Sequence, residues 1–145
     1  MKIVHFDDDP FVTCITTAVI DASVGDCAAS EFYLDSRELK RSARDRGITD
    51  MTVKHINDHS LYFFNTRNLG VPVFALREAR SKLIWEKDKN GRILMYYSDT
   101  ADCDKTHPIK PNTVVISAHN VWSLEPLPPI GDIPQTKVVF TCRMD

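Results

Sequence analysis

The sequence has no CxxC pair, no basic and apolar leader and no long apolar run, and each absence excludes a class of protein. Its four cysteines are spread along the chain in a spacing that no zinc site uses: Cys14, Cys27, Cys103 and Cys142. No stretch approaches the ~18 apolar residues of a transmembrane helix. The opening MKIVHFDDDP turns acidic where a secretory signal would be apolar. We therefore expect a cytoplasmic protein with free thiols.

Strong charge and compositional bias are also missing. The 145 residues include 18 basic and 20 acidic side chains, and the resulting net charge of −2 argues against a partner such as a nucleic acid. Only 5 glycines and 8 prolines are present, which excludes collagen-like and low-complexity classes. The acidic segment 99–104 lacks the glycine and distant glutamate of a calcium loop. The sequence shows no catalytic constellation, so we expect neither a metal, a cofactor nor an enzyme.

The pattern of β-branched residues and turn signals predicts an α+β domain. Residues 1–10 are interpreted as a tail or a leading strand, and the domain itself as 11–145. Ser23 and Ser36 are suited to begin two short helices, and Gly47 to end the second. The predicted strands cover 11–20, 51–57, 60–67, 75–88, 92–99, 113–127 and 134–145. Helices kept apart from a run of antiparallel strands favour α+β over a parallel α/β sheet.

Alternating residues in these strands divide an apolar face from a polar one. In 75–86 one face contains Ala79, Leu83 and Trp85 and is the better inward candidate, although it also carries Arg77. Glu78 then falls on the other face, where we expect solvent. A long curved sheet with such a face needs a cover, which is a helix or a ligand.

Several segments in order resemble the START domain, the lipid-transfer domain named for steroidogenic acute regulatory protein. AVIDAS precedes the helices, VPVFALREARSKLIW is similar to the family's proline-arginine strand, and GRILMYYSDT to the strand after it. HPIKPNTVVISAHNVWSLEPL resembles the proline-rich loop and following strand, and PQTKVVFTCRMD the strand before the last helix. The resemblance implies a helix-grip fold like that of the birch-pollen allergen group. The expected sheet is curved and antiparallel, with about six strands and two short helices after the first.

The resemblance further implies a cavity for one hydrophobic ligand, a sterol, a phospholipid or a similar lipid, with a role in lipid transfer or sensing. A few polar groups in an apolar tunnel would orient the ligand. The candidate contacts are Arg77, Ser81, Tyr97, His119, Asn120 and Trp122. Arg77 has an alternative interpretation, which is pairing with a carboxylate. His119 and Asn120 cannot both point inward on one regular strand.

One departure from the family pattern keeps a rival hypothesis open. The chain stops at Asp145, where the family continues into a C-terminal helix, so we expect that helix to be missing and the sheet face to be uncovered. The chain is then a piece of a larger parent chain, or an interaction module whose apolar face is covered by a partner or a second copy. An enzyme of the wider class, such as a cyclase, would need a polar cluster built from Arg77, Tyr97 and His119.

The second predicted helix is basic, with five cations against two carboxylates: Arg37, Lys40, Arg41, Arg44 and Arg46 against Glu38 and Asp45. One interpretation is a solvated helix face. The other is a surface that makes transient contact with anionic membrane lipids.

Overall fold

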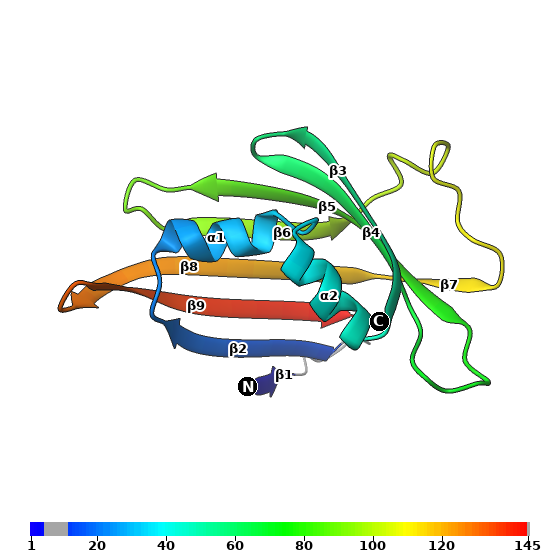
Figure 1. Ribbon diagram of the computed structural model, residues 1–145, viewed down its shortest axis with the longest axis horizontal. Coiled ribbons are helices and arrows are strands. Elements are labelled where there is room, and N and C mark those ends of the chain that lie inside the picture. Colours follow the sequence, from blue (N-terminus) through cyan, green and yellow to red (C-terminus); the bar gives the residue numbers. More distant parts are fainter. Residues whose placement is uncertain (5–11, 145) are drawn as a thin grey trace.

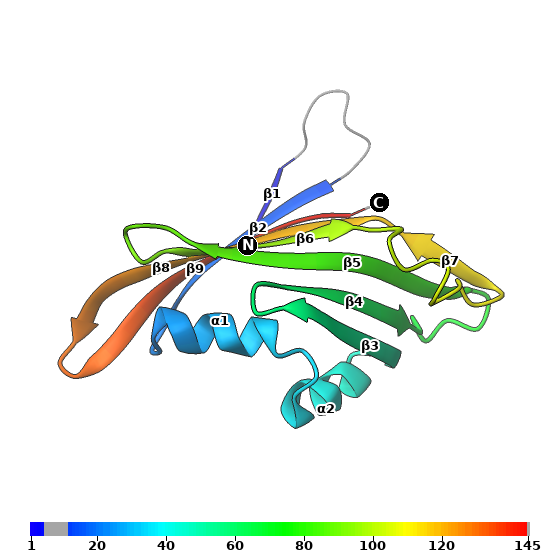
Figure 2. The same cartoon turned by 90° about the horizontal axis from the view of Figure 1, so that it is seen from above.

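The computed structural model describes residues 1–4 and 12–144, which form one large curved sheet with two helices on its concave side (Figures 1 and 2). The helices are α1 (Val24–Phe32) and α2 (Arg37–Asp45). The strands are β1 (Lys2–Val4), β2 (Val12–Ile20), β3 (Ile48–Asn57), β4 (Ser60–Arg67), β5 (Leu76–Lys87), β6 (Ile93–Asp99), β7 (Thr113–Ile116), β8 (Ala118–Ile130) and β9 (Ile133–Met144). The α+β class and the helix-grip arrangement are confirmed.

The strands follow the order β1-β2-β9-β8-β6-β5-β4-β3, and β7 lies beside β5. All neighbours are antiparallel except β5 and β7, which are parallel. The prediction of about six strands was too low, since the described residues form nine. The last element of the described chain is β9.

Both helices begin where the sequence predicts, and the second also ends there. The Ser23 hydroxyl accepts the amide hydrogen of Asp26 at 3.1 Å, and the Ser36 hydroxyl accepts that of Leu39 at 3.3 Å. Each serine thereby satisfies an amide that the first turn leaves free. Gly47 follows α2 with φ +78°, and a Cβ there would lie 2.6 Å from the Asn68 carbonyl oxygen. Only glycine fits this turn into β3.

The core lies between α1 and the middle of the sheet. Leu61, Leu83 and Met95 are completely buried on the concave face, and Phe32 of α1 packs onto the same cluster. Leu61 pairs with Leu83, and Leu83 pairs with Tyr97, so these three side chains form a row across β4, β5 and β6. The inward face predicted for 75–86 is confirmed by the burial of Leu83 and Ala79.

Two of the differences from the predicted strands have a local cause. The predicted strand 113–127 is divided at Ser117, where the Asp99 carboxylate accepts from the Ser117 hydroxyl and, at 3.1 Å, from the Ala118 amide. The prolines at 128–129 predicted a loop, but β8 continues to Ile130. The register shifts between Leu127 and Ile130, and such an irregularity accommodates residues that lack an amide hydrogen.

Glu78 lies on the convex face, as its parity requires, but the prediction that it meets solvent was wrong. Its exposed fraction is 4%, and that of Arg80 is 5%, because the loop 100–112 covers this part of the sheet. Arg80 Nε lies 2.7 Å from Glu78 Oε1, and the same guanidinium binds the Asp104 carboxylate and the His107 carbonyl oxygen. Its carbon Cζ also lies 5.1 Å from the centre of the Phe64 ring.

Removing Arg80 should be the most destabilising single change on the convex face. R80M leaves the buried Glu78 carboxylate without its counter-charge, so we expect a loss of about 3–5 kcal/mol in the free energy of unfolding in urea. The double variant E78M/R80M should regain part of that loss. D104N alters an exposed partner and should lose less than about 1 kcal/mol. Equal losses in R80M and D104N would contradict this account.

Candidate functional site

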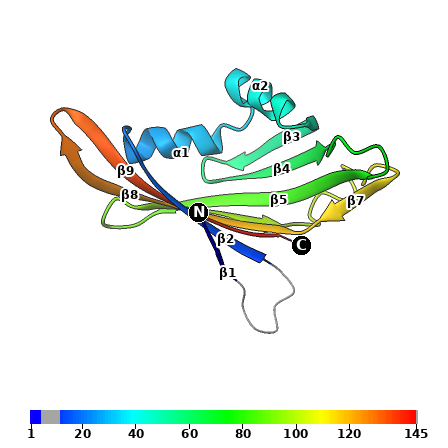
Figure 3. The ribbon, with the colours of Figure 1, turned by 90° about the horizontal axis from the view of Figure 1, so that it is seen from below.

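A groove of about 250 Å³ lies between α1 and the strands β2, β8 and β9. Figures 2 and 3 show α1 lying across the concave side of the sheet. The strands supply an apolar wall and α1 supplies a polar rim. The lining residues are Ile20, Ala22, Asp26, Cys27, Ser30, Glu31, Trp122, Leu124 and Val138.

The wall follows from the two-residue period of β8 and β9. Trp122 pairs with Phe140 and Leu124 pairs with Val138, so all four side chains fall on the concave face. The rings of Trp122 and Phe140 lie 4.3 Å apart between centroids. Leu124 and Val138 are buried, whereas Trp122 and Phe140 are only partly so.

The concave face remains open toward β2. Ile20 lines the groove, yet 43% of it is exposed. Thr16 and Ala18 share its face on β2 and are also exposed. In the described structure α1 packs against β6, β8 and β9, and Phe32 at its end joins the core formed by β4 and β5, whereas the concave side of β2 remains accessible.

Tyr97 ties α1 to the sheet at one end of the groove. Its exposed fraction is 8%, and its hydroxyl donates to the Glu31 carbonyl oxygen at 3.2 Å. Burial raises the pKa of the Tyr97 phenol far above its ordinary value, and the nearby Glu31 carboxyl raises it further. Burial also raises the pKa of the Glu31 carboxyl, while the positive charge of Arg46 partly opposes that shift.

Asn120 is the neighbour of Tyr97 across the strand pair and lies on the same concave face. Its Oδ1 atom is buried and has no hydrogen-bond partner among the described residues. Asn120 in turn pairs with Cys142, and Cys142 with Cys14. Burial raises the pKa of the Cys142 thiol, and the adjacent Cys14 raises it further, so this end of the wall is uncharged.

The structure brings only part of the predicted ligand set to the groove. Trp122 lines it. Tyr97 and Asn120 are not among the lining residues, but Tyr97 is hydrogen-bonded to the lining residue Glu31 and Asn120 is the cross-strand neighbour of Tyr97. Ser81 is buried on the concave face but lies on β5, away from the groove lining. Their roles as ligand contacts stay predictions.

Arg77 and His119 lie elsewhere. Arg77 is near the start of β5, where its Nη1 donates to the Ala75 carbonyl oxygen at 3.3 Å and its Cζ lies 6.0 Å from the Phe74 ring centre. Within residues 1–4 and 12–144, no ion pair joins Arg77 to the carboxylate that the sequence suggested as an alternative partner. His119 alternates with Asn120, is exposed, and lies 3.5 Å from the Asp99 carboxylate. Neither residue lines the groove.

Sequence reasoning missed the helical rim of the groove. Cys27, Ser30 and Glu31 have the i, i+3, i+4 spacing of one helix face. That spacing was visible in the sequence. Nothing in it pointed to the strands that complete the groove, which lie 90 or more residues later, at about 122–138. In residues 1–4 and 12–144, no group of three or more His, Cys, Asp or Glu side chains is arranged to hold a metal. No helix among the same residues is long and apolar enough to cross a membrane.

The sequence matches no family model and no curated protein, but the fold matches solved structures. The human StarD13 lipid transfer and protein localization domain superposes with a TM-score of 0.71 at 12% identity over 96% of this chain and 65% of that one. A STAR-related lipid transfer protein from Xanthomonas axonopodis gives 0.71 at 14% identity, over 95% and 72%. Human StAR-related lipid transfer protein 5 gives 0.69 at 14%, over 99% and 71%.

This chain has the helix-grip fold of the START domains. It spans about two thirds of the length of these neighbours. Norcoclaurine synthase from Thalictrum flavum also matches, with a TM-score of 0.51 at 9% identity over 97% of this chain and 81% of the synthase. Binding proteins and an enzyme therefore share the architecture, and function must be argued from the groove itself.

Replacing Glu31 should stabilise the protein at neutral pH. Folding raises the pKa of the Glu31 carboxyl above 4.5. At any pH at which this carboxyl is ionised, its charge therefore destabilises the folded state. E31Q should then be more stable than the parent at pH 7, and the difference should shrink as the pH falls and vanish below about pH 4. Urea unfolding at several pH values measures this. E38Q removes an exposed carboxylate of α2 and serves as the control; an equal gain in both variants would refute the burial argument.

Proposed function

We propose that the chain binds one amphiphilic lipid in the groove beside α1 and does not convert it chemically. The observation that carries this proposal is the apolar concave wall of Trp122, Leu124 and Val138, which α1 borders on one side only. Each Å² of apolar ligand surface removed from water there contributes roughly 25 cal/mol. The groove volume of about 250 Å³ suits part of a lipid, and the remainder would lie against the open surface near β2.

Two observations favour binding over catalysis. The residues that would have built a polar reaction centre are separated: His119 lies on the convex face, and Arg77 lies six residues along β5 from Leu83, the partner of Tyr97. At about 3.3 Å per residue that separation is roughly 20 Å. Likeness in fold to lipid transfer domains supports transfer or sensing of the bound lipid as the wider role, by analogy of architecture.

A second candidate function is an interaction module, and the exposure of Ile20 and its neighbours on β2 favours it. In that case a second copy or a partner chain covers the concave face. Gel filtration with light scattering separates the two. A monomer that carries lipid supports the first proposal, and an obligate oligomer without lipid supports the second.

Placing a charge in the groove wall should abolish lipid binding without unfolding the protein. Ile20 and Val19 are adjacent on β2 and are 43% and 57% exposed, but only Ile20 lines the groove. I20D forces a ligand to bury an unpaired carboxylate, so we expect at least a tenfold loss of affinity for an uncharged fluorescent lipid. V19D, on the opposite face of the strand, should bind as the parent does.

Native mass spectrometry of the purified parent and of both variants gives an independent measurement. Lipid should co-purify with the parent and V19D and be lost from I20D. Equal lipid content or equal affinity in the two variants would contradict the groove as the binding site. Absence of binding in the parent would reject the proposed function itself.

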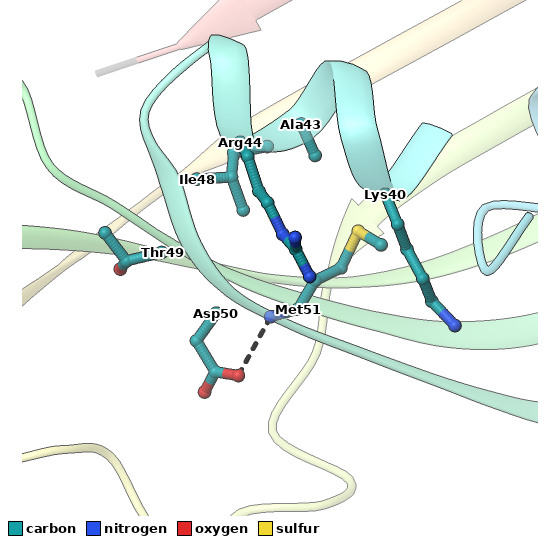
Figure 4. A pocket seen from close by; sticks show the side chains of 7 residues that line it. All are labelled: Lys40, Ala43, Arg44, Ile48, Thr49, Asp50 and Met51. Atoms are coloured by element: carbon teal, nitrogen blue, oxygen red, sulfur yellow. Dashed lines mark hydrogen bonds between the residues drawn. The ribbon is translucent and has the colours of Figure 1, made fainter. Parts of the chain in front are cut away.

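We further propose that α2 makes transient contact with anionic membranes during transfer. Arg37, Lys40, Arg41 and Arg44 are exposed, and none of them has an ion-pair partner within the described residues. Figure 4 shows Lys40 and Arg44 extending from the same side of α2. Each basic residue near an anionic surface contributes about 1 kcal/mol.

Reversing two of these charges should remove the membrane contact. R41E/R44E should lower binding to vesicles containing phosphatidylserine at least tenfold in a co-sedimentation assay, and binding by the parent should weaken as salt is added. K87E/K89E makes the same charge change on the β5–β6 hairpin, where both lysines are exposed. Equal losses in the two double variants would attribute the effect to net charge and contradict a role for α2.

A further inference from the structure

We propose that the groove selects amphiphiles whose headgroup is a protonated amine, an inference that rests on the proposed function. Two of the side chains that line the groove are carboxylates, Asp26 and Glu31, and the Glu31 carboxylate has no hydrogen-bond donor among the described residues. No lysine, arginine or histidine is found among the described residues that line the groove. An ammonium group carries a positive charge and three N–H donors, and so complements this rim.

The first acceptor is the Glu31 carboxylate. It lines the groove near the end of α1, and in the part of the chain that the structure describes no donor forms a hydrogen bond to it. Asp26 differs, because its Oδ2 accepts the Ser23 hydroxyl hydrogen at 2.6 Å and belongs to the cap of α1. Glu31 is therefore the carboxylate left available to a ligand. Its backbone carbonyl is bound by Tyr97, so the residue is held in place at the groove end.

The second acceptor, observed independently, is Asn120 Oδ1. This atom is buried on the concave face without a partner, and Asn120 stands two residues before Trp122 on the same face of β8. The only hydroxyl next to it across the strand pair is that of Tyr97, which already donates to α1. A buried acceptor without a donor is unfavourable, and a ligand that supplies an N–H removes the penalty. A sulfate headgroup has no donor to offer.

The nearest competitor for Glu31 is Arg46 at the end of α2. Its positive charge opposes the rise in the pKa of the Glu31 carboxyl, so the two groups interact electrostatically. However, Arg46 is exposed, its Nε donates to the Ser42 carbonyl oxygen at 3.2 Å, and no ion pair joins it to Glu31. An ammonium placed in the groove would approach the carboxylate more closely. Hydrogen bonds between charged groups are roughly twice as strong as neutral ones.

Three ligands with the same ten-carbon chain test the proposal: decylammonium, decanol and decyl sulfate, each below its micelle concentration at pH 7. The fluorescence of Trp122 in the groove wall, with Trp85 as the other tryptophan, reports binding. Decylammonium should bind at least tenfold more tightly than decyl sulfate, with decanol between them. Equal affinities would overturn the headgroup proposal and leave the proposed function intact. Failure of all three to bind would reject the proposed function as well.

Matched variants locate the selectivity. E31Q should weaken decylammonium binding at least fivefold and leave decanol binding unchanged, and its effect cannot come from unfolding if E31Q is the more stable protein. N120L should weaken both donor-bearing ligands relative to decyl sulfate. E38Q removes one negative charge from the exposed face of α2 and should leave all three affinities unchanged. A decylammonium preference that survives in E31Q, or that E38Q reduces to the same extent, would overturn the proposal.

Discussion

A strongly curved sheet presents a concave apolar surface that one short helix cannot cover. Here α1 has nine residues, and it packs over the middle of the sheet through Phe32 while Tyr97 holds its end by a hydrogen bond to Glu31. The concave side of β2, at the edge of this surface, is left accessible. The groove exists because the cover is shorter than the sheet is wide, and its position follows from where α1 is fixed.

Successive strand residues alternate between the two faces of the sheet, so the convex face can stabilise the fold while the concave face forms the groove. On the convex face Arg80 binds Glu78, Asp104 and the His107 carbonyl oxygen, and so holds the loop 100–112 against β4 and β5. That network is stabilising. On the concave face, Ser81 and Leu83, which lie one and three residues closer to the hairpin than Arg80, are buried in the interior. Stability and binding are thus separated on the same strand, β5.

Sequence patterns predicted what depends on neighbours along the chain. The serine caps, the glycine stop and most strands were predicted because each depends on a few adjacent residues. The division at Ser117 depends on Asp99, and the burial of Glu78 depends on a loop more than 20 residues later. For the groove, strand alternation and the family resemblance pointed to Trp122. Glu31 on the rim lies far from Trp122 in the sequence, and the two line the same groove only in the folded chain. Contacts between distant segments carry no signal in a single sequence.

The distribution of charge suits a protein that meets a membrane and holds an amine. The chain as a whole is close to neutral, with a net charge of −2, yet its charges are segregated. The cations of α2 are exposed, while the carboxylates of α1 lie along the groove. An anionic surface would attract α2, and the acidic rim would repel the same lipids from the groove. A bilayer could then serve as a docking surface without its anionic lipids competing for the groove. The negative charge of these lipids is attracted by the cations of α2 and repelled by the carboxylates of the groove rim.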